Sequence, residues 1–72
     1  MTVRYIYKGE IIGGGTIQII PQEGQFVEFQ TANKIFIVTD VMFKTVLSGD
    51  VCAMIYLGDI TLEKEQKLRK YK

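Results

Sequence analysis

Glycines and other turn-forming residues divide this chain into short segments rich in β-branched and aromatic residues. The dividing positions are Gly9, residues 13–15, 21–24, 32–33 and 48–50, and Gly58. Short apolar segments separated by turns about every 8–12 residues are typical of an all-β barrel or sandwich. The chain has 72 residues, so we expect one small domain over residues 1–72, with a core that is marginal by itself.

Five segments show the two-residue alternation of a β-strand, at residues 2–8, 15–20, 26–31, 35–43 and 51–57. Ile11 and Ile12 either extend the second segment or pair separately across the glycines. In the fourth segment the alternation shifts between Val38 and Val41, which predicts a β-bulge that bends the strand. Residues 61–70 are rich in helix formers, and Thr61 is a plausible N-cap. The sequence therefore predicts a mainly β fold, in which a five-stranded, mostly antiparallel curled sheet or open barrel is followed by a short C-terminal helix.

The alternation also assigns one apolar face to each strand, and these faces predict a shared core. The expected core residues are Val3, Tyr5, Ile17, Ile19, Val27, Phe29, Phe36, Val38, Val41, Val51, Ala53, Ile55 and Leu57. The second face of the fifth segment is also apolar, because it carries Cys52, Met54 and Tyr56. A chain this small lacks the material to cover both faces, so we expect these three residues and Leu62 to form an interface in a homo-oligomer.

Catalysis is improbable on composition. The chain has no histidine, one cysteine and one serine, so the usual acid–base and nucleophilic groups are nearly absent. A zinc site of the Cys/His type is excluded for the same reason. We expect no enzymatic activity, no metal and no cofactor. No apolar run reaches the roughly 20 residues that span a bilayer, and no signal peptide is recognisable, so a cytoplasmic location without membrane contact is expected.

A glycine-rich segment, formed by Gly13, Gly14, Gly15 and Thr16, invites comparison with phosphate-binding loops. It lacks the Lys-Ser/Thr pair of a P-loop, and no helix follows it. A flexible hairpin tip or a bulge is the simpler interpretation. The other hypothesis is a small-ligand or nucleotide site between subunits that uses this segment.

Basic residues gather at the C-terminus. Residues 1–60 carry four basic and six acidic side chains, whereas residues 61–72 carry five basic and two acidic ones. The basic residues are Lys64, Lys67, Arg69, Lys70 and Lys72. They match the dipole of a helix C-terminus, and they also make a nucleic-acid-binding barrel an alternative function, with the tyrosines at the sheet edge available for stacking.

Residues 21–57 run through a turn, a strand, a tight hairpin, a bulged strand and a returning strand. The order Pro21 to Phe29, Lys34 to Val41 and Asp50 to Ile55 resembles small Src-homology-3-like barrels encoded by phages and other mobile elements. The resemblance implies an accessory or host-interaction role in the host cytoplasm, and it assigns no functional residue. Together with the apolar second faces, it favours a non-enzymatic module that acts by protein–protein contact with itself and with an unidentified protein.

Overall fold

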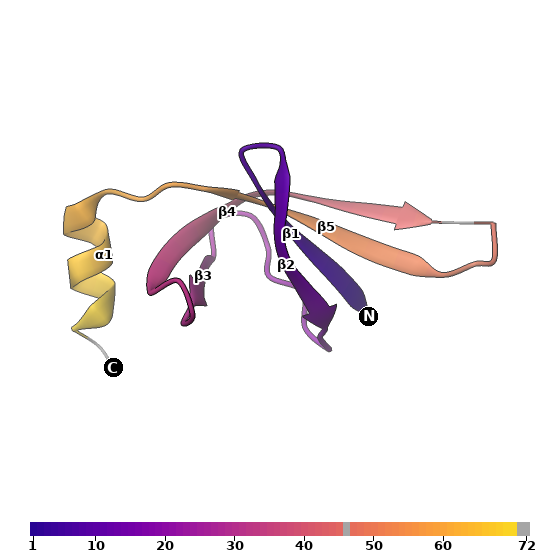
Figure 1. The fold of residues 1–72 in the computed structure, drawn as a ribbon, viewed down its shortest axis with the longest axis horizontal. Coiled ribbons are helices and arrows are strands. Elements are labelled where there is room, and N and C mark those ends of the chain that lie inside the picture. Colours follow the sequence, from indigo (N-terminus) through magenta and orange to yellow (C-terminus); the bar gives the residue numbers. More distant parts are fainter. Residues whose placement is uncertain (46, 71–72) are drawn as a thin grey trace.

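The computed structural model describes residues 1–45 and 47–70, and in them five strands are followed by one helix (Figure 1). The elements are β1 (Thr2–Tyr7), β2 (Glu10–Thr16), β3 (Phe26–Phe29), β4 (Lys34–Thr45), β5 (Val51–Gly58) and α1 (Leu62–Arg69). The expected mainly β fold with a short C-terminal helix is confirmed. Lys72 lies outside the described residues.

The strands form a single sheet in the order β2-β1-β5-β4-β3, which curls into a half-barrel. Three neighbouring pairs are antiparallel, and β1 runs parallel to β5. The sheet is therefore mixed. The parallel pair joins strands from the two ends of the chain, and it places β1 against the side of β5 that faces away from β4.

The second strand differs from the one expected at residues 15–20. Lys8 and Gly9 both adopt positive φ, of 51° and 80°, and this two-residue turn reverses the chain at once. Glu10 consequently pairs with Tyr7, and the three glycines lie inside β2 instead of at a hairpin tip. A bulge does interrupt the pairing next to them, since Tyr5 pairs with Gly13 and Ile6 with Ile11. Residues 17–20 belong to the connection between β2 and β3.

Two of the turns expected at the dividing positions, at residues 21–24 and 32–33, are present in the backbone. Gly24 has a φ of 88° in a turn that is closed by the bond from the Gln25 N–H to the carbonyl of Gln22, and Asn33 adopts a φ of 51°. The bulge in β4 is also present. Val38 pairs with Leu57 and Asp40 with Tyr56, which leaves Thr39 as the extra residue. The bulge keeps Val38 and Val41 on the same side of the sheet.

The core lies on the concave side of the half-barrel. Its buried members are Val3, Phe36, Val38, Ala53, Ile55 and Leu57. The other expected core residues are half-buried, apart from Ile19, which is 86% exposed. Placing Ile19 in the core was wrong, because it follows the end of β2 and no strand ladder turns it inward. Ile17 and Ile20, from the same connection, do pack against the core.

Two buried residues, Ile6 and Ile35, occupy the convex side, where the sequence predicted no core. Ile6 lies beside Tyr56 in the β1–β5 ladder. Ile35 lies beside Glu28, the residue to which Arg69 of α1 is bonded. Arg69 therefore holds the helix on the convex side of β3, the same side of the sheet on which Ile35 is buried.

The helix begins as predicted. Thr61 is its N-cap, and the threonine Oγ1 accepts a hydrogen bond from the backbone N–H of Lys64 at 3.1 Å. The helix packs against its own chain through Arg69 and through Lys64, whose ammonium lies 5.3 Å from the centre of the Phe26 ring. These contacts hold a short helix that would be marginal alone.

Candidate functional site

The most unusual feature of the fold is a hairpin arm, which we define as residues 42–45 of β4 and 47–51 at the start of β5. β1 pairs with β5 only from Cys52 onward. The tip of the arm extends beyond the other strands, at the opposite end of the molecule from α1 (Figure 1), and the molecule measures 44 × 23 × 21 Å. Three large apolar side chains of the arm are exposed: Met42 by 45%, Phe43 by 53% and Leu47 by 110%. They contribute nothing to the core, so the arm holds apolar surface that is available to another molecule.

The convex side of the sheet presents three cross-strand rows near the arm. The rows are Thr2, Cys52 and Lys44; Arg4, Met54 and Met42; and Ile6, Tyr56 and Asp40. The predicted interface residues Cys52, Met54 and Tyr56 thus occupy the middle of this surface, and each is half-buried. Leu62 does not join them, because it lies on α1 at the other end of the sheet, where it is 68% exposed.

The outer edge of β4 is unpaired along the arm. β3 pairs only with residues 34–37 of β4, and two further backbone bonds join Val38 to Gly24 and Gln25. Among the described residues, no strand pairs with this edge from Asp40 to Thr45. The backbone groups that point outward there can accept an added strand.

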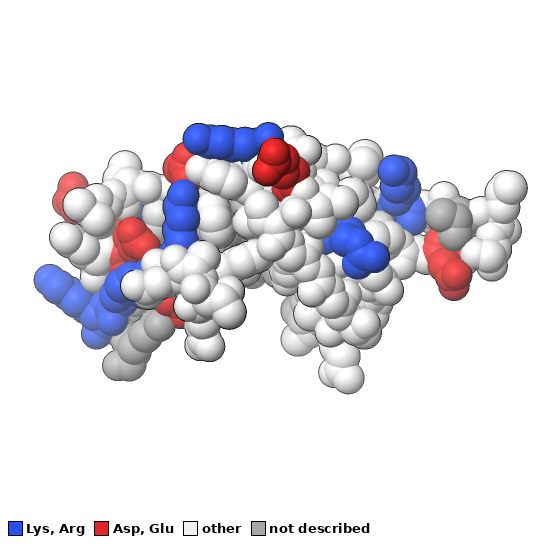
Figure 2. Space-filling model, in the orientation of Figure 1, with Lys and Arg blue, Asp and Glu red and all other residues white. Residues whose placement is uncertain are grey.

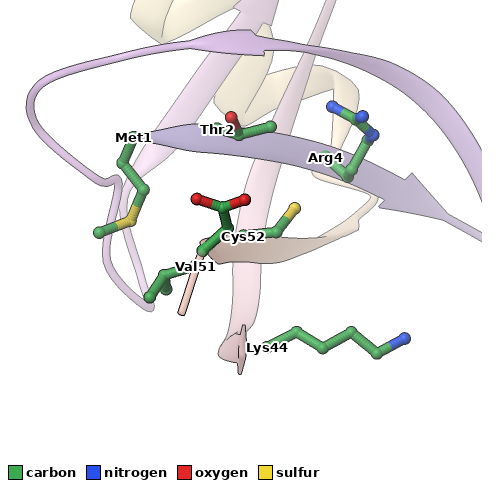
Figure 3. Close-up of a pocket in the computed structure, with 7 residues that line it drawn as sticks. Met1, Thr2, Arg4, Lys44, Val51 and Cys52 are labelled. Carbon is green, nitrogen blue, oxygen red and sulfur yellow. The ribbon is translucent and has the colours of Figure 1, made fainter. Parts of the chain in front are cut away.

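A hollow of about 520 Å³ lies on the convex side at the base of the arm. It is lined by Met1, Thr2, Arg4, Lys44, Asp50, Val51 and Cys52. Figure 3 shows that Thr2 and Arg4 come from β1, Cys52 from the neighbouring β5 and Lys44 from β4. The hollow is separate from the glycine-rich segment, and its lining combines two cations with one carboxylate.

The structure gives two of the three glycines in the glycine-rich segment a packing role. A Cβ on Gly13 would lie 3.0 Å from Cε2 of Phe29, and one on Gly14 would lie 2.8 Å from the carbonyl oxygen of Val3. Gly15 and Thr16 follow in the same edge strand and are exposed. The close approach of the backbone to Phe29 and Val3 explains the two glycines without a ligand. A ligand site at this segment stays a prediction.

The basic residues of the helix are only partly available. Arg69 donates to Glu65 at 2.9 Å, to Glu28 at 2.8 Å and to the carbonyl of Asn33 at 3.0 Å. The hydrogen bonds to Glu65 and Glu28 raise the pKa of its guanidinium. Lys64 lies over an aromatic ring, whereas Lys67 and Lys70 are exposed. Figure 2 shows basic groups gathered over α1 with acidic groups among them. Nucleic-acid binding by this helix therefore stays a prediction that rests on fewer free charges than the sequence suggested.

A polar cluster closes the concave side near the start of β4. The Tyr7 hydroxyl donates to Oδ1 of Asp59 at 2.6 Å, and the Lys34 ammonium lies 3.1 Å from the same oxygen. Hydrogen bonds from Tyr7 and Lys34 lower the pKa of the Asp59 carboxyl, and the bond to Asp59 raises the pKa of Lys34. Lys34 also lies 4.8 Å from the centre of the Tyr7 ring and 4.9 Å from that of Phe36. The cluster links the ends of three strands, so its evident role is structural.

Within the described part of the chain, no three His, Cys, Asp or Glu side chains gather as a metal-binding group. No helix in residues 1–45 or 47–70 is long and apolar enough to cross a membrane.

Sequence reasoning found the bulge and the apolar second face of β5, but it missed the arm. Phe43 continues the inward alternation of β4, and from the pattern alone it is indistinguishable from a core residue. The difference in strand length becomes visible only once the strands are placed. β4 has 12 residues and β3 has only four, so most of one edge of β4 has no neighbouring strand among the described residues.

Searches of protein-family models, of curated proteins and of solved structures gave no match to this chain.

Proposed function

We propose that this protein is a non-enzymatic module that binds other protein chains, and that the arm is its binding surface. The observation that supports the proposal is the exposure of Met42, Phe43 and Leu47 on a projection that the core does not need. Full burial of one such side chain contributes about 1.5–3 kcal/mol. Three of them on a slender hairpin provide a compact set of anchors for a partner.

The unpaired edge of β4 supports the same proposal from the backbone. Strand addition supplies main-chain hydrogen bonds, while side chains on the two sides of the sheet provide specificity. The arm offers both sides, because Phe43 points to the concave side and Met42 to the convex side. A partner that adds a strand would contact the exposed apolar groups and the edge at the same time.

The test compares a double variant, Phe43→Ser with Leu47→Ser, with the wild-type chain. Ile19→Ser is the matched control, because Ile19 is an exposed apolar residue outside the arm. Each immobilised protein is incubated with nuclease-treated lysate, and the retained proteins are quantified, after circular dichroism has confirmed the fold. The proposal expects a set of proteins retained by the wild type and the control but lost by the arm variant. Equal retention by all three proteins would contradict it.

A further inference from the structure

We infer that the free edge of β4 pairs with the same edge of a second copy of this chain, in an antiparallel and twofold-symmetric arrangement centred on Met42. This inference rests on the proposed function, since it names the partner of the arm. A symmetric interface uses the same surface on both copies, so the surface must complement itself. The sequence along this edge satisfies that condition in one register.

The length of the pairing segment follows from the fold. Gly24 and Gln25 occupy the edge position beside Val38, with backbone bonds of 2.9 and 2.8 Å. The free edge therefore starts after the bulge at Thr39. At the other end the chain leaves β4 after Thr45 and returns to β5, on the side away from the edge. The segment that can pair is residues 40–44, whose outer edge is covered by no strand among the described residues.

The register follows from charge. Two strands joined by a twofold axis share their sheet faces, so each residue lies opposite a residue of the same side. Asp40, Met42 and Lys44 lie on the convex side, as their partners Tyr56, Met54 and Cys52 show. With Met42 on the axis, Asp40 of each copy lies opposite Lys44 of the other. Opposite charges in cross-strand pairs stabilise a sheet, and like charges destabilise it.

The neighbouring symmetric registers lack this match. An axis at Val41 places Lys44 beside Val38, and an axis at Phe43 places Lys44 opposite Met42. Only the axis at Met42 matches both charges of the segment, and it also sets Val41 opposite Phe43 on the concave side. The row of Met54 and Met42 then continues into the second copy, so the convex surface becomes one sheet surface across the pair.

An edge of five residues makes a small interface, and small interfaces give weak complexes. We expect a dimer with a dissociation constant in the micromolar range. Asp40 and Lys44 are exposed, so raised salt should weaken the pair.

Charge exchange tests the register. Asp40→Lys and Lys44→Asp each place like charges opposite one another twice per dimer, and each should raise the dissociation constant about tenfold or more. The double variant, Asp40→Lys with Lys44→Asp, restores the opposite charges and should recover the dimer. Lys67→Glu is the control for a changed net charge. Sedimentation equilibrium at micromolar concentrations, at low and high salt, measures all four variants. If the single variants weaken the dimer and the double variant does not restore it, the proposed register is overturned.

Disulfide trapping gives a second measurement that does not depend on charge. In a Cys52→Ser background, Met42→Cys places two thiols across the axis and should yield an oxidised dimer. Lys44→Cys, in the same background, places its thiols about 14 Å apart along the strands and should not. Trapping by Lys44→Cys alone, or a wild-type monomer at all concentrations, would overturn the inference. If a monomer still retains other proteins through the arm, the dimer is refuted and the proposed function stands.

Discussion

The three consecutive glycines of β2 should respond differently to alanine, because their surroundings differ. A Cβ on Gly14 would lie 2.8 Å from a backbone oxygen, that of Val3, and 3.1 Å from Nη1 of Arg4. A Cβ on Gly13 would lie 3.0 Å from the edge of the Phe29 ring. A Cβ on Gly15 would meet nothing within 4 Å. None of the three has positive φ, so backbone strain is not a factor.

The magnitudes follow from two opposing effects. Replacing glycine by alanine in a compatible conformation stabilises a protein by about 0.4–1 kcal/mol, because the unfolded chain loses freedom. Overpacking costs about 1–3 kcal/mol. Gly15→Ala reduces the freedom of the unfolded chain without overpacking the folded one, so the free energy of unfolding should rise by about 0.5 kcal/mol. Gly14→Ala must displace backbone and should lose about 1–2 kcal/mol. Gly13→Ala should fall between them, since the Phe29 ring can shift by a few tenths of an ångström.

Thermal unfolding followed by circular dichroism, at one protein concentration, ranks the three variants. A change of 1 kcal/mol moves the Tm of a domain this small by about 4–8 °C. Gly14→Ala should therefore lower the Tm by about 4–16 °C, and Gly15→Ala should raise it by about 2–4 °C. A larger loss for Gly15→Ala than for Gly14→Ala would refute the reasoning, because it would mean that the pairing of β2 with β1 is shifted by one residue.

Three further predictions concern the polar cluster, the helix and the core. The pKa of the Asp59 carboxyl is lowered in the folded protein. Its contribution to stability is therefore present above about pH 4 and is lost as the pH falls through the folded pKa. In urea titrations, the free energy of unfolding should fall less between about pH 7 and about pH 2.5 for Asp59→Asn than for the wild type. Arg69→Ala should reduce the helical signal at 222 nm while the sheet stays folded, and Lys67→Ala should leave that signal unchanged. Ile55→Ala should lower the free energy of unfolding by about 2–5 kcal/mol, and the same truncation at the exposed Ile19 should change it by less than about 0.5 kcal/mol.

Local features of the fold were predictable because they depend on neighbouring residues. The bulge at Thr39 follows from the position of the next apolar residue, and the positive φ values at Gly24 and Asn33 follow from residues that tolerate them. Thr61 was recognisable as the N-cap, because its hydroxyl bonds to a backbone N–H three residues later. None of these depends on which strands become neighbours.

The candidate site was predictable only in part. The apolar second face of β5 marked Cys52 and Met54 as surface for another chain, and the structure places both beside the arm. The exposure of Phe43 could not be predicted from the sequence. The apolar alternation of β4 is the same in the part that faces the core and in the part that faces solvent. The lengths of the strands reveal an uncovered edge only when the order of the strands in the sheet is known.

The sequence by itself determined the class of the fold, the turns, the bulge and the helix start, because each is decided within a few residues by backbone conformation and side-chain period. Only the tertiary structure decided that β1 lies parallel to β5, that Ile6 and Ile35 are buried on the convex side, and that the arm projects with a free edge. These outcomes depend on contacts between segments far apart in the chain. The free energy of such contacts comes from packing and from loop closure, which no local pattern records.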